Sequence, residues 1–236
     1  MIETLTFTPA EAAKISGVNA TLQRDWRRRK ITRPLEGPQA RFTPFEVAEL
    51  MALGALAGKG LSPLSFKGVA GKLGACIVKK ALTIRSAYMG PADLVLSLDM
   101  ERLESIRGSR HDLDDHIWSW RAAALARSVI GREGHMDVDY DAFIQWAEGS
   151  FDFYRSLISP FEQIDDNDSR MAGAIVIVSL RALGIEFAKR AGPIVSVSQA
   201  FIDNQNGLQG FNKVRALLKE IQAEASHQKP SARAAG

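Results

Sequence analysis

Apolar residues recur along this chain at the three- and four-residue spacing of helices, between interruptions rich in Gly and Pro, and this pattern predicts a mainly α fold. The predicted helices cover residues 8–17, 19–30, 43–57, 62–82, 112–130, 139–158 and 169–191, with shorter ones at 198–203 and 208–225. Two stretches leave alternatives open. Residues 94–98 fit a short strand or part of a helix over 91–106, and the β-branched run at 174–178 also suits a strand.

Capping signals define the first two helices. Thr8 precedes Pro9 and stands three residues before Glu11, which is the pattern of a capping box at a helix start. Gly17 is placed to end this helix, and Asn19 is placed to cap the next one. The turn between the two helices is therefore tight, and the pair has the layout of a helix-turn-helix.

The second helix has two unlike sides. Leu22 and Trp26 stand four residues apart and predict a side that is buried in the core. At about 100° per residue, the opposite side and its flank carry mostly guanidinium groups. The residues there are Thr21, Arg24, Arg27 and Arg28. Such a helix side can meet DNA phosphates along its length and base edges near its start.

The residues after the second helix predict a two-stranded hairpin. Its strands cover 31–35 and 39–43, and its turn covers 36–38 with Gly and Pro. A hairpin in this position forms a small β-wing, which gives a helix-turn-helix a second arm for DNA.

These features resemble the winged helix-turn-helix of the MerR and excisionase-like superfamily over about the first third of the chain. The similar segments are Phe7–Ala13, Ser16–Val18, Thr21–Leu22 with Arg24, Arg41–Thr43 and Phe45–Leu50. In that superfamily the second helix enters the major groove and the wing contacts the adjacent backbone. The resemblance implies DNA-facing roles for Gln23, Arg24, Arg27, Arg28 and Arg41. The full candidate set adds Thr21, Lys30, Arg33 and Gln39.

We predict two domains and a tail. Residues 1–84 form the DNA-binding domain, and residues 85–226, entered through a linker at 85–91, form an all-α or mostly α domain for dimerisation, effector binding or interaction. Residues 227–236 have the composition of a disordered tail. In the helix predicted over 62–82, the expected buried residues are Leu64, Val69, Leu73, Ile77 and Leu82. Its three glycines either admit a close neighbouring helix or leave loose packing.

Charge is distributed unevenly along the chain. The first 82 residues carry 13 Lys and Arg against 6 Asp and Glu, a net charge of +7, whereas the rest carries 17 against 21, a net charge of −4. A basic segment attracts nucleic acid, and an acidic remainder suits protein contacts. With no export signal at its start and no run of about 18 apolar residues, we expect a cytoplasmic protein without membrane contact.

Several groups of residues invite an enzymatic or metal-binding interpretation. The lone Cys76 excludes an internal disulfide and a multi-cysteine metal site, and its apolar surroundings predict burial. His111 and His116 lie about 140° apart on a helix, which is poor for chelation. Residues 165–168 lack the Gly and distal Glu of a calcium loop and predict a helix cap instead. The aromatic residues between 118 and 154 fit a core more often than a ligand pocket. We predict no catalytic residues, metal site, cofactor or enzyme activity.

The leading hypothesis is a sequence-specific, MerR-like transcriptional regulator that binds double-stranded DNA as a homodimer, with the transcription machinery or an effector as a further partner. One alternative is an architectural DNA-binding factor in recombination, phage development or DNA packaging. The other is a helical module that binds a ligand or a protein and for which DNA is secondary.

Overall fold

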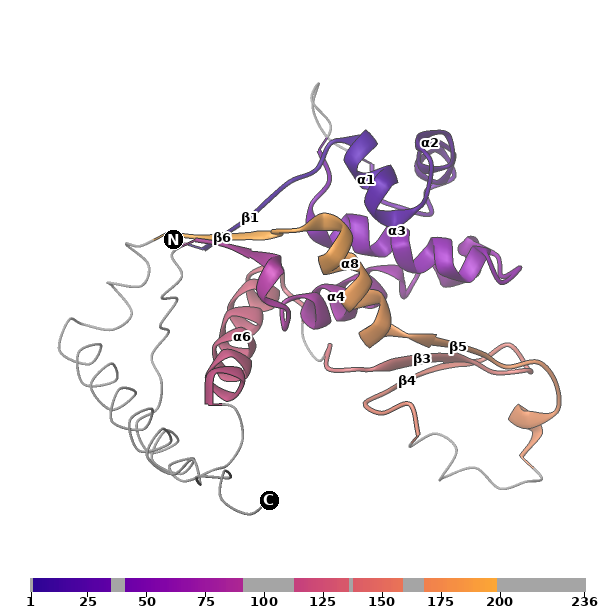
Figure 1. Ribbon diagram of the computed structural model, residues 1–236. Helices are drawn as coiled ribbons and strands as arrows, with labels where there is room; N and C mark the ends of the chain where they lie inside the picture. The colour runs from indigo at the N-terminus through magenta and orange to yellow at the C-terminus, as the bar shows by residue number, and fades with distance from the viewer. Residues whose placement is uncertain (1, 35–40, 91–112, 136–137, 159–167, 199–236) are drawn as a thin grey trace, which may run out of the picture.

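The computed structural model describes residues 2–34, 41–90, 113–135, 138–158 and 168–198, and the structural statements below concern these residues (Figure 1). Their fold is mainly α with two small sheets, as the periodicity predicted. The predictions for 94–98, 198–203, 208–225 and 227–236 lie outside the described residues. Within the described residues, none of the helices combines the length and the apolar composition that crossing a membrane requires.

The described elements alternate helices and short strands. The helices are α1 (Pro9–Ser16), α2 (Ala20–Arg28), α3 (Pro44–Ala57), α4 (Ala70–Ala81), α6 (Leu113–Arg132) and α8 (Leu180–Ala191), with 3₁₀ turns at Pro63–Phe66, Arg85–Ala87 and Ser169–Met171. The strands are β1 (Ile2–Thr4), β2 (Tyr88–Met89), β3 (Ala142–Gln145), β4 (Phe151–Tyr154), β5 (Val176–Ser179) and β6 (Val195–Val197). They form two sheets with the orders β1-β6-β2 and β4-β3-β5.

Capping boxes begin both α1 and α3, which confirms the predicted helix starts. The backbone N–H of Thr8 donates to the Glu11 carboxylate at 2.7 Å, and the Glu11 N–H donates back to the Thr8 hydroxyl at 3.3 Å. Thr43 and Glu46 repeat both bonds at the start of α3. Gly17 ends α1 with a left-handed φ of 78°, a conformation that glycine adopts without a steric cost.

Helix α4 lies at the centre of the core, between α3 and α8. A Cβ added at Gly74 of α4 would lie 2.8 Å from the Phe45 carbonyl oxygen in α3. A Cβ added at Gly184 of α8 would lie 2.8 Å from the Ile77 carbonyl oxygen in α4. Glycine at these two positions therefore lets three helices approach backbone to backbone, and of the two alternatives for the α4 glycines, close approach holds at Gly74.

The first sheet joins segments from both ends of the chain. Strand β6 pairs antiparallel with β1, with Ile2 opposite Val197, and parallel with β2, with Tyr88 opposite Val195. The linker predicted at 85–91 is therefore wrong over its described residues, which form a 3₁₀ turn and a strand. The hydrophobic core runs continuously from β1 to β6, so the predicted boundary at residue 84 passes through a shared core.

The helix predicted over 139–158 is wrong, because β3 and β4 form a hairpin there. Phe143 lies opposite both Phe153 and Val178 in the sheet and is fully buried. Gly149, with φ of 97°, allows the tight turn between the strands. Pairing of β3 with a strand on each side buries Ala142, Phe143 and Ile144 in succession, and this packing overrode a sequence that also fits helical spacing.

Two other predicted helices need correction and one is confirmed. The segment 169–191 divides into a 3₁₀ turn, β5 and α8, so its β-branched run forms a strand, the alternative left open above. The segment 62–82 is helical only from Ala70, and Leu64 is 59% exposed, because the chain makes a separate 3₁₀ turn there and buries Phe66 instead. Helix α6 confirms the segment 112–130 and continues past Gly131 to Arg132.

Gly74→Ala tests the close approach of α3 and α4. We expect it to lower the free energy of unfolding by about 1–3 kcal/mol, because the added methyl group meets rigid backbone. Gly71→Ala in the same helix is the control, since its Cβ would meet no atom within 4 Å. The control should stabilise by about 0.5–1 kcal/mol through helix propensity. Urea denaturation of both variants measures this, and equal effects of the two substitutions would contradict the packing described.

Candidate nucleic-acid interface

Helices α1 and α2, with the turn between them and the residues that end α2, form a compact unit over residues 8–31. The Ser16 hydroxyl donates to the Ala12 carbonyl at 2.6 Å and accepts from the Val18 N–H at 3.1 Å, which fixes the turn. The Asn19 side chain accepts from the Leu22 N–H at 2.9 Å and caps α2, as predicted. The two helices are therefore joined by a turn whose polar groups are satisfied locally.

Gln23 is a core residue, so its predicted DNA-facing role is wrong. Its side chain is 1% exposed, and its amide nitrogen donates to the Val18 carbonyl at 2.8 Å and more weakly to the Pro9 carbonyl at 3.4 Å. Trp26 is buried as predicted, but Leu22 is 36% exposed, so its predicted burial is wrong. The buried side of α2 therefore consists of Gln23 and Trp26, whereas Leu22 and Trp26 were predicted. The Gln23 amide takes the place of an apolar side chain because it donates to the turn and to the start of α1.

Helix α2 ends in a left-handed residue that is not glycine. Lys30 has φ of 58°, and its N–H donates to the Arg27 carbonyl at 2.9 Å. The Ile31 N–H donates to the Trp26 carbonyl at 2.8 Å, and both side chains are buried. This pair of bonds is a Schellman motif, which satisfies the last carbonyls and turns the chain back toward the core.

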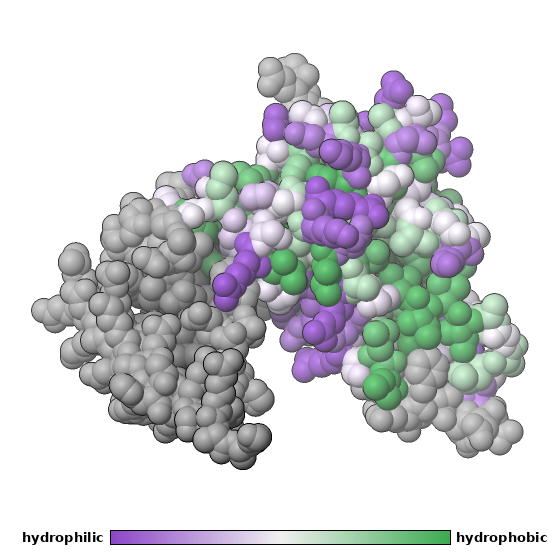
Figure 2. Space-filling model, viewed as in Figure 1, coloured by the Kyte–Doolittle hydropathy of each residue, from purple (hydrophilic) through white to green (hydrophobic). Residues whose placement is uncertain are grey.

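The exposed side of α2, which we call the basic face, consists of Thr21, Arg24, Arg28 and Arg29 together with Asp25. Four of them, all except Arg29, line a shallow open groove of about 240 Å³. The Arg24 Nε donates to the Ala20 carbonyl at 3.3 Å, which holds this side chain along the helix. Figure 2 shows hydrophilic side chains gathered at the top of the molecule, where Figure 1 places α1 and α2.

The remaining candidates lie around the basic face. The Arg27 guanidinium stands over the Phe42 ring at 5.5 Å, which keeps it at the flank as predicted. Lys30 and Arg33 are exposed. Arg41 is exposed too, but its guanidinium already donates to the Thr6 hydroxyl at 2.7 Å and to the Thr6 carbonyl at 3.0 Å. Gln39 lies outside the described residues.

The two-stranded wing predicted at 31–43 is not formed by the residues that the structure describes there. Residues 31–34 are in no strand, and 35–40 lie outside the described chain. Phe42 instead forms an antiparallel bridge with Phe7, with both N–H groups donating at 2.8 Å. The segment that was expected to close a hairpin therefore tethers the start of α3 to the start of α1.

Arg190 of α8 connects the α1–α2 unit to a segment 175 residues further along the chain. Its Nη1 donates to the Ile15 carbonyl at 3.2 Å, and its Nε donates to the Glu186 carboxylate at 2.7 Å. A cation at the last carbonyls of α1 also complements the helix dipole. Sequence reasoning missed this contact, because no local pattern marks a partner so distant.

Ionisable groups behind the α1–α2 unit are shifted by burial. Burial raises the pKa of Glu49 from 4.5 to about 7, while Arg33 opposes this shift and Glu46 adds to it. His135 stacks on Phe45 with ring centroids 5.2 Å apart, and its burial lowers the pKa of the imidazole. Arg33 therefore lies close enough to Glu49 of α3 to favour its charged form.

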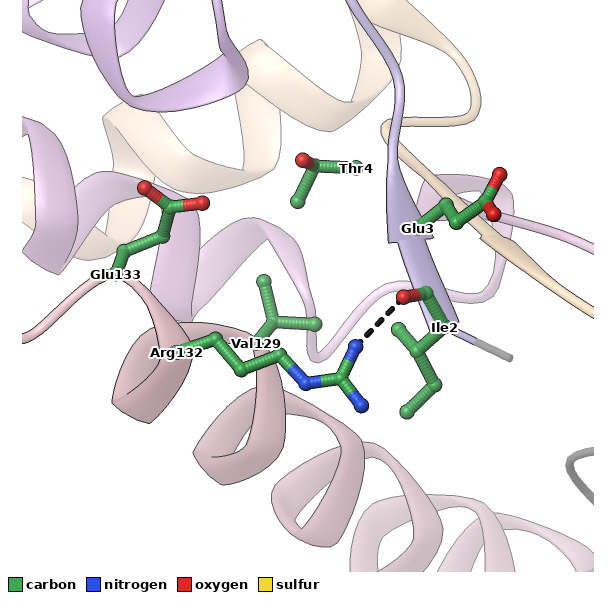
Figure 3. A pocket seen from close by; sticks show the side chains of 6 residues that line it. All are labelled: Ile2, Glu3, Thr4, Val129, Arg132 and Glu133. Carbon is green, nitrogen blue, oxygen red and sulfur yellow. Dashed lines mark hydrogen bonds between the residues drawn. The ribbon is translucent and has the colours of Figure 1, made fainter.

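The remaining described features offer neither a metal site nor an enclosed ligand space of obvious function. Among the described residues, no group of three potential metal ligands is brought together. A cavity of about 350 Å³ lies between β1 and α6 (Figure 3). The Arg132 guanidinium that lines it donates to the Ile2 carbonyl at 2.7 Å, so this cation is already engaged within the fold. Phe143 packs against Phe66 and Phe153 in the core rather than around a ligand space.

The predicted burial of Cys76 holds, and the helix cap predicted at 165–168 holds in part, because Asp168 caps a short 3₁₀ turn whereas Ser179 caps α8. Cys76 is fully buried, and that burial raises the pKa of its thiol to about 12, so it is an unreactive core residue. Asp168 caps the 3₁₀ turn at Ser169–Met171 by accepting from the Arg170 N–H at 2.9 Å. Asp165, Asp166, His111 and the side chain of His116 lie outside the described part.

Substitution of Gln23 tests whether it is a core residue. Gln23→Met keeps the shape but leaves the Val18 carbonyl without its donor, so we expect a loss of about 1–2 kcal/mol in unfolding free energy. Gln23→Glu places a carboxylate in the same space and should cost about 3 kcal/mol or more. Urea denaturation at neutral pH measures both. Near-wild-type stability of both variants would show that Gln23 is not a core residue.

Glu49 predicts a pH dependence of stability. Because its pKa is raised in the folded state, the neutral carboxyl favours folding at low pH, and this contribution is lost as the pH rises through about 7. We expect Glu49→Gln to be more stable than the wild type by about 1–3 kcal/mol near pH 8, and equal to it near pH 4. Denaturation curves across this range test it, with Glu186→Gln as the exposed control. A parallel pH profile for wild type and Glu49→Gln would refute the assignment.

Comparisons with protein-family models, with curated proteins and with solved structures found no match to this chain. The geometry and charge of the α1–α2 unit are therefore the features that point to a function.

Proposed function

We propose that this protein is a sequence-specific DNA-binding regulator of transcription and that α2 enters the major groove of its site. The observation that carries the proposal is the basic face. A short helix, capped by Asn19 and locked by Gln23, presents Arg24 and Arg28 to solvent on one side. Both ends of this helix are fixed by hydrogen bonds, so the arginines project from a rigid support.

The chemistry of this function is non-covalent. Arg28 and Lys30 near the end of α2, and Arg33 beyond it, neutralise phosphates and release counterions. Thr21 and Arg24, nearer the helix start, reach base edges, where a guanidinium pairs best with guanine. The net charge of +7 over the first 82 residues draws the duplex to this end of the molecule.

The MerR-like resemblance supports the same orientation on DNA. In proteins of that type a dimer places two such helices in successive turns of the major groove, which doubles the contacted site. We propose the same arrangement for this chain. An architectural role in recombination or DNA packaging would use the same face with less dependence on base sequence.

A second candidate, a protein-binding module, has one observation in its favour. Figure 2 shows apolar side chains on the surface around the β4-β3-β5 sheet, at the end of the molecule away from α2. Phe151 is 37% exposed and Ile177 is 45% exposed on this sheet. Exposed apolar surface of this kind often marks a protein contact. A wild-type chain that binds a protein but no DNA would establish this role instead.

The double variant Arg24→Ala/Arg28→Ala tests the proposed face. We expect affinity for a duplex site selected by the wild type to fall by about 100-fold or more, because each guanidinium contact is worth about 1–3 kcal/mol. Thermal unfolding should change little, since both side chains are exposed. Fluorescence anisotropy with labelled duplex measures the affinity.

The matched control is Arg181→Ala/Lys189→Ala on α8. It removes the same charge from another exposed helix surface, so it separates a local contact from a general loss of positive charge. We expect at most a small loss of affinity for the control. Equal losses for the two double variants, or wild-type affinity for Arg24→Ala/Arg28→Ala, would refute the assigned face.

A further inference from the structure

The basic face contains one carboxylate, and it holds two of the arginines. Asp25 is the only acidic residue of α2. Its Oδ1 accepts from the Arg28 Nη2 at 2.6 Å, and its Oδ2 accepts from the Arg29 Nε at 2.9 Å. Each oxygen of the carboxylate therefore has its own arginine, and the strongest cationic end of α2 is partly neutralised before any DNA arrives.

These ion pairs can be exchanged. The Arg28 and Arg29 side chains are 77% and 64% exposed, while Asp25 is 22% exposed. Ion pairs at a protein surface contribute little to stability, so a phosphate can replace Asp25 as the partner of either arginine at small cost to that arginine, and the cost falls on the less exposed carboxylate. When both arginines leave, the carboxylate is left beside the duplex without donors. It then repels phosphates and the acceptor-rich edges of guanine and thymine.

One partner in the major groove can satisfy that carboxylate. The exposed amino group of cytosine, and to a lesser extent that of adenine, donates to Asp or Glu. We propose that Asp25 is a specificity-determining residue, which penalises general DNA binding and is satisfied only at a site that offers an amino-bearing base edge. This inference rests on the proposed DNA-binding function and deepens it.

A purely structural role for Asp25 makes a different prediction. Pairs three or four residues apart are common helix-stabilising contacts, and α8 contains a comparable one between Glu186 and Arg190 at 2.7 Å. If Asp25 serves only the helix, its removal would slightly lower stability and leave DNA discrimination unchanged. Glu186→Gln is therefore a matched control, because it breaks an exposed pair and raises the net charge by the same amount.

The experiment compares the full-length wild type, Asp25→Asn and Glu186→Gln. Each binds two probes in anisotropy titrations, a mixed-sequence duplex and a duplex selected by the wild type from a random pool, between about 50 and 200 mM salt. For Asp25→Asn we expect about tenfold tighter binding to the mixed-sequence duplex and a log–log salt slope steeper by about 1 to 2, because two arginines are freed for phosphates. The selected duplex should gain less than about threefold, so discrimination falls. A fresh selection with Asp25→Asn should lose a cytosine or adenine preference at one position.

The other outcomes are decisive as well. Equal tightening on both duplexes, no change on either, or the same change for Glu186→Gln would overturn the role of Asp25 while leaving the proposed function intact. A wild type that binds neither duplex would overturn the proposed function and this inference together. Thermal unfolding of each variant confirms that differences in binding do not arise from unfolding.

Discussion

Helices α3 and α8 approach α4 so closely that backbone meets backbone, and this contact sets the positions of the other helices. Gly74 and Gly184 remove the side chains that would hold these helices apart. With α4 enclosed in this way, eight of its twelve residues are buried, and Gly71 and the three lysines are the exceptions. Helix α1 then packs on α3 and α8, so the position of the α1–α2 unit follows from a core that lies mostly beneath it. Close packing of this kind transmits little flexibility to the elements it supports.

The α1–α2 unit shows how a short, highly charged helix is kept in place. A helix of nine residues that contains three arginines and is followed by a fourth, Arg29, has little intrinsic tendency to stay folded. Trp26 and Gln23 are buried and hold α2 on the core. Asn19 caps the start of the helix, and Lys30, in the left-handed conformation, ends it. On the exposed side the charged side chains contact only groups of the same segment, since Arg24 donates to the Ala20 carbonyl and Asp25 pairs with Arg28 and Arg29. One side of α2 thus packs on the core, and the opposite side exposes the charged residues.

The sequence predicted what local chemistry determines and failed where distant contacts decide. Both capping boxes, the Gly17 stop and the Asn19 cap were predictable, because each depends on residues within four positions. The burial of Gln23 was not, since its partners lie in the turn and at the start of α1. The β3–β4 hairpin was missed because aromatic residues at 143, 151 and 153 fit helical and alternating patterns alike. The Arg190 contact with Ile15 and the pairing of β2 with β6 join segments more than 100 residues apart, which no local pattern encodes.

The central claim is that the basic face of α2 recognises a DNA sequence. The most direct test is selection from a random-sequence duplex pool by the full-length protein, followed by competition of the selected duplex against bulk DNA at two salt concentrations. We expect an enriched inverted repeat that withstands bulk competitor at the higher salt, because base contacts add to the phosphate contacts. Recovery of unenriched sequences, with weak binding that disappears at the higher salt, would show that the face is only an electrostatic patch and would contradict the account.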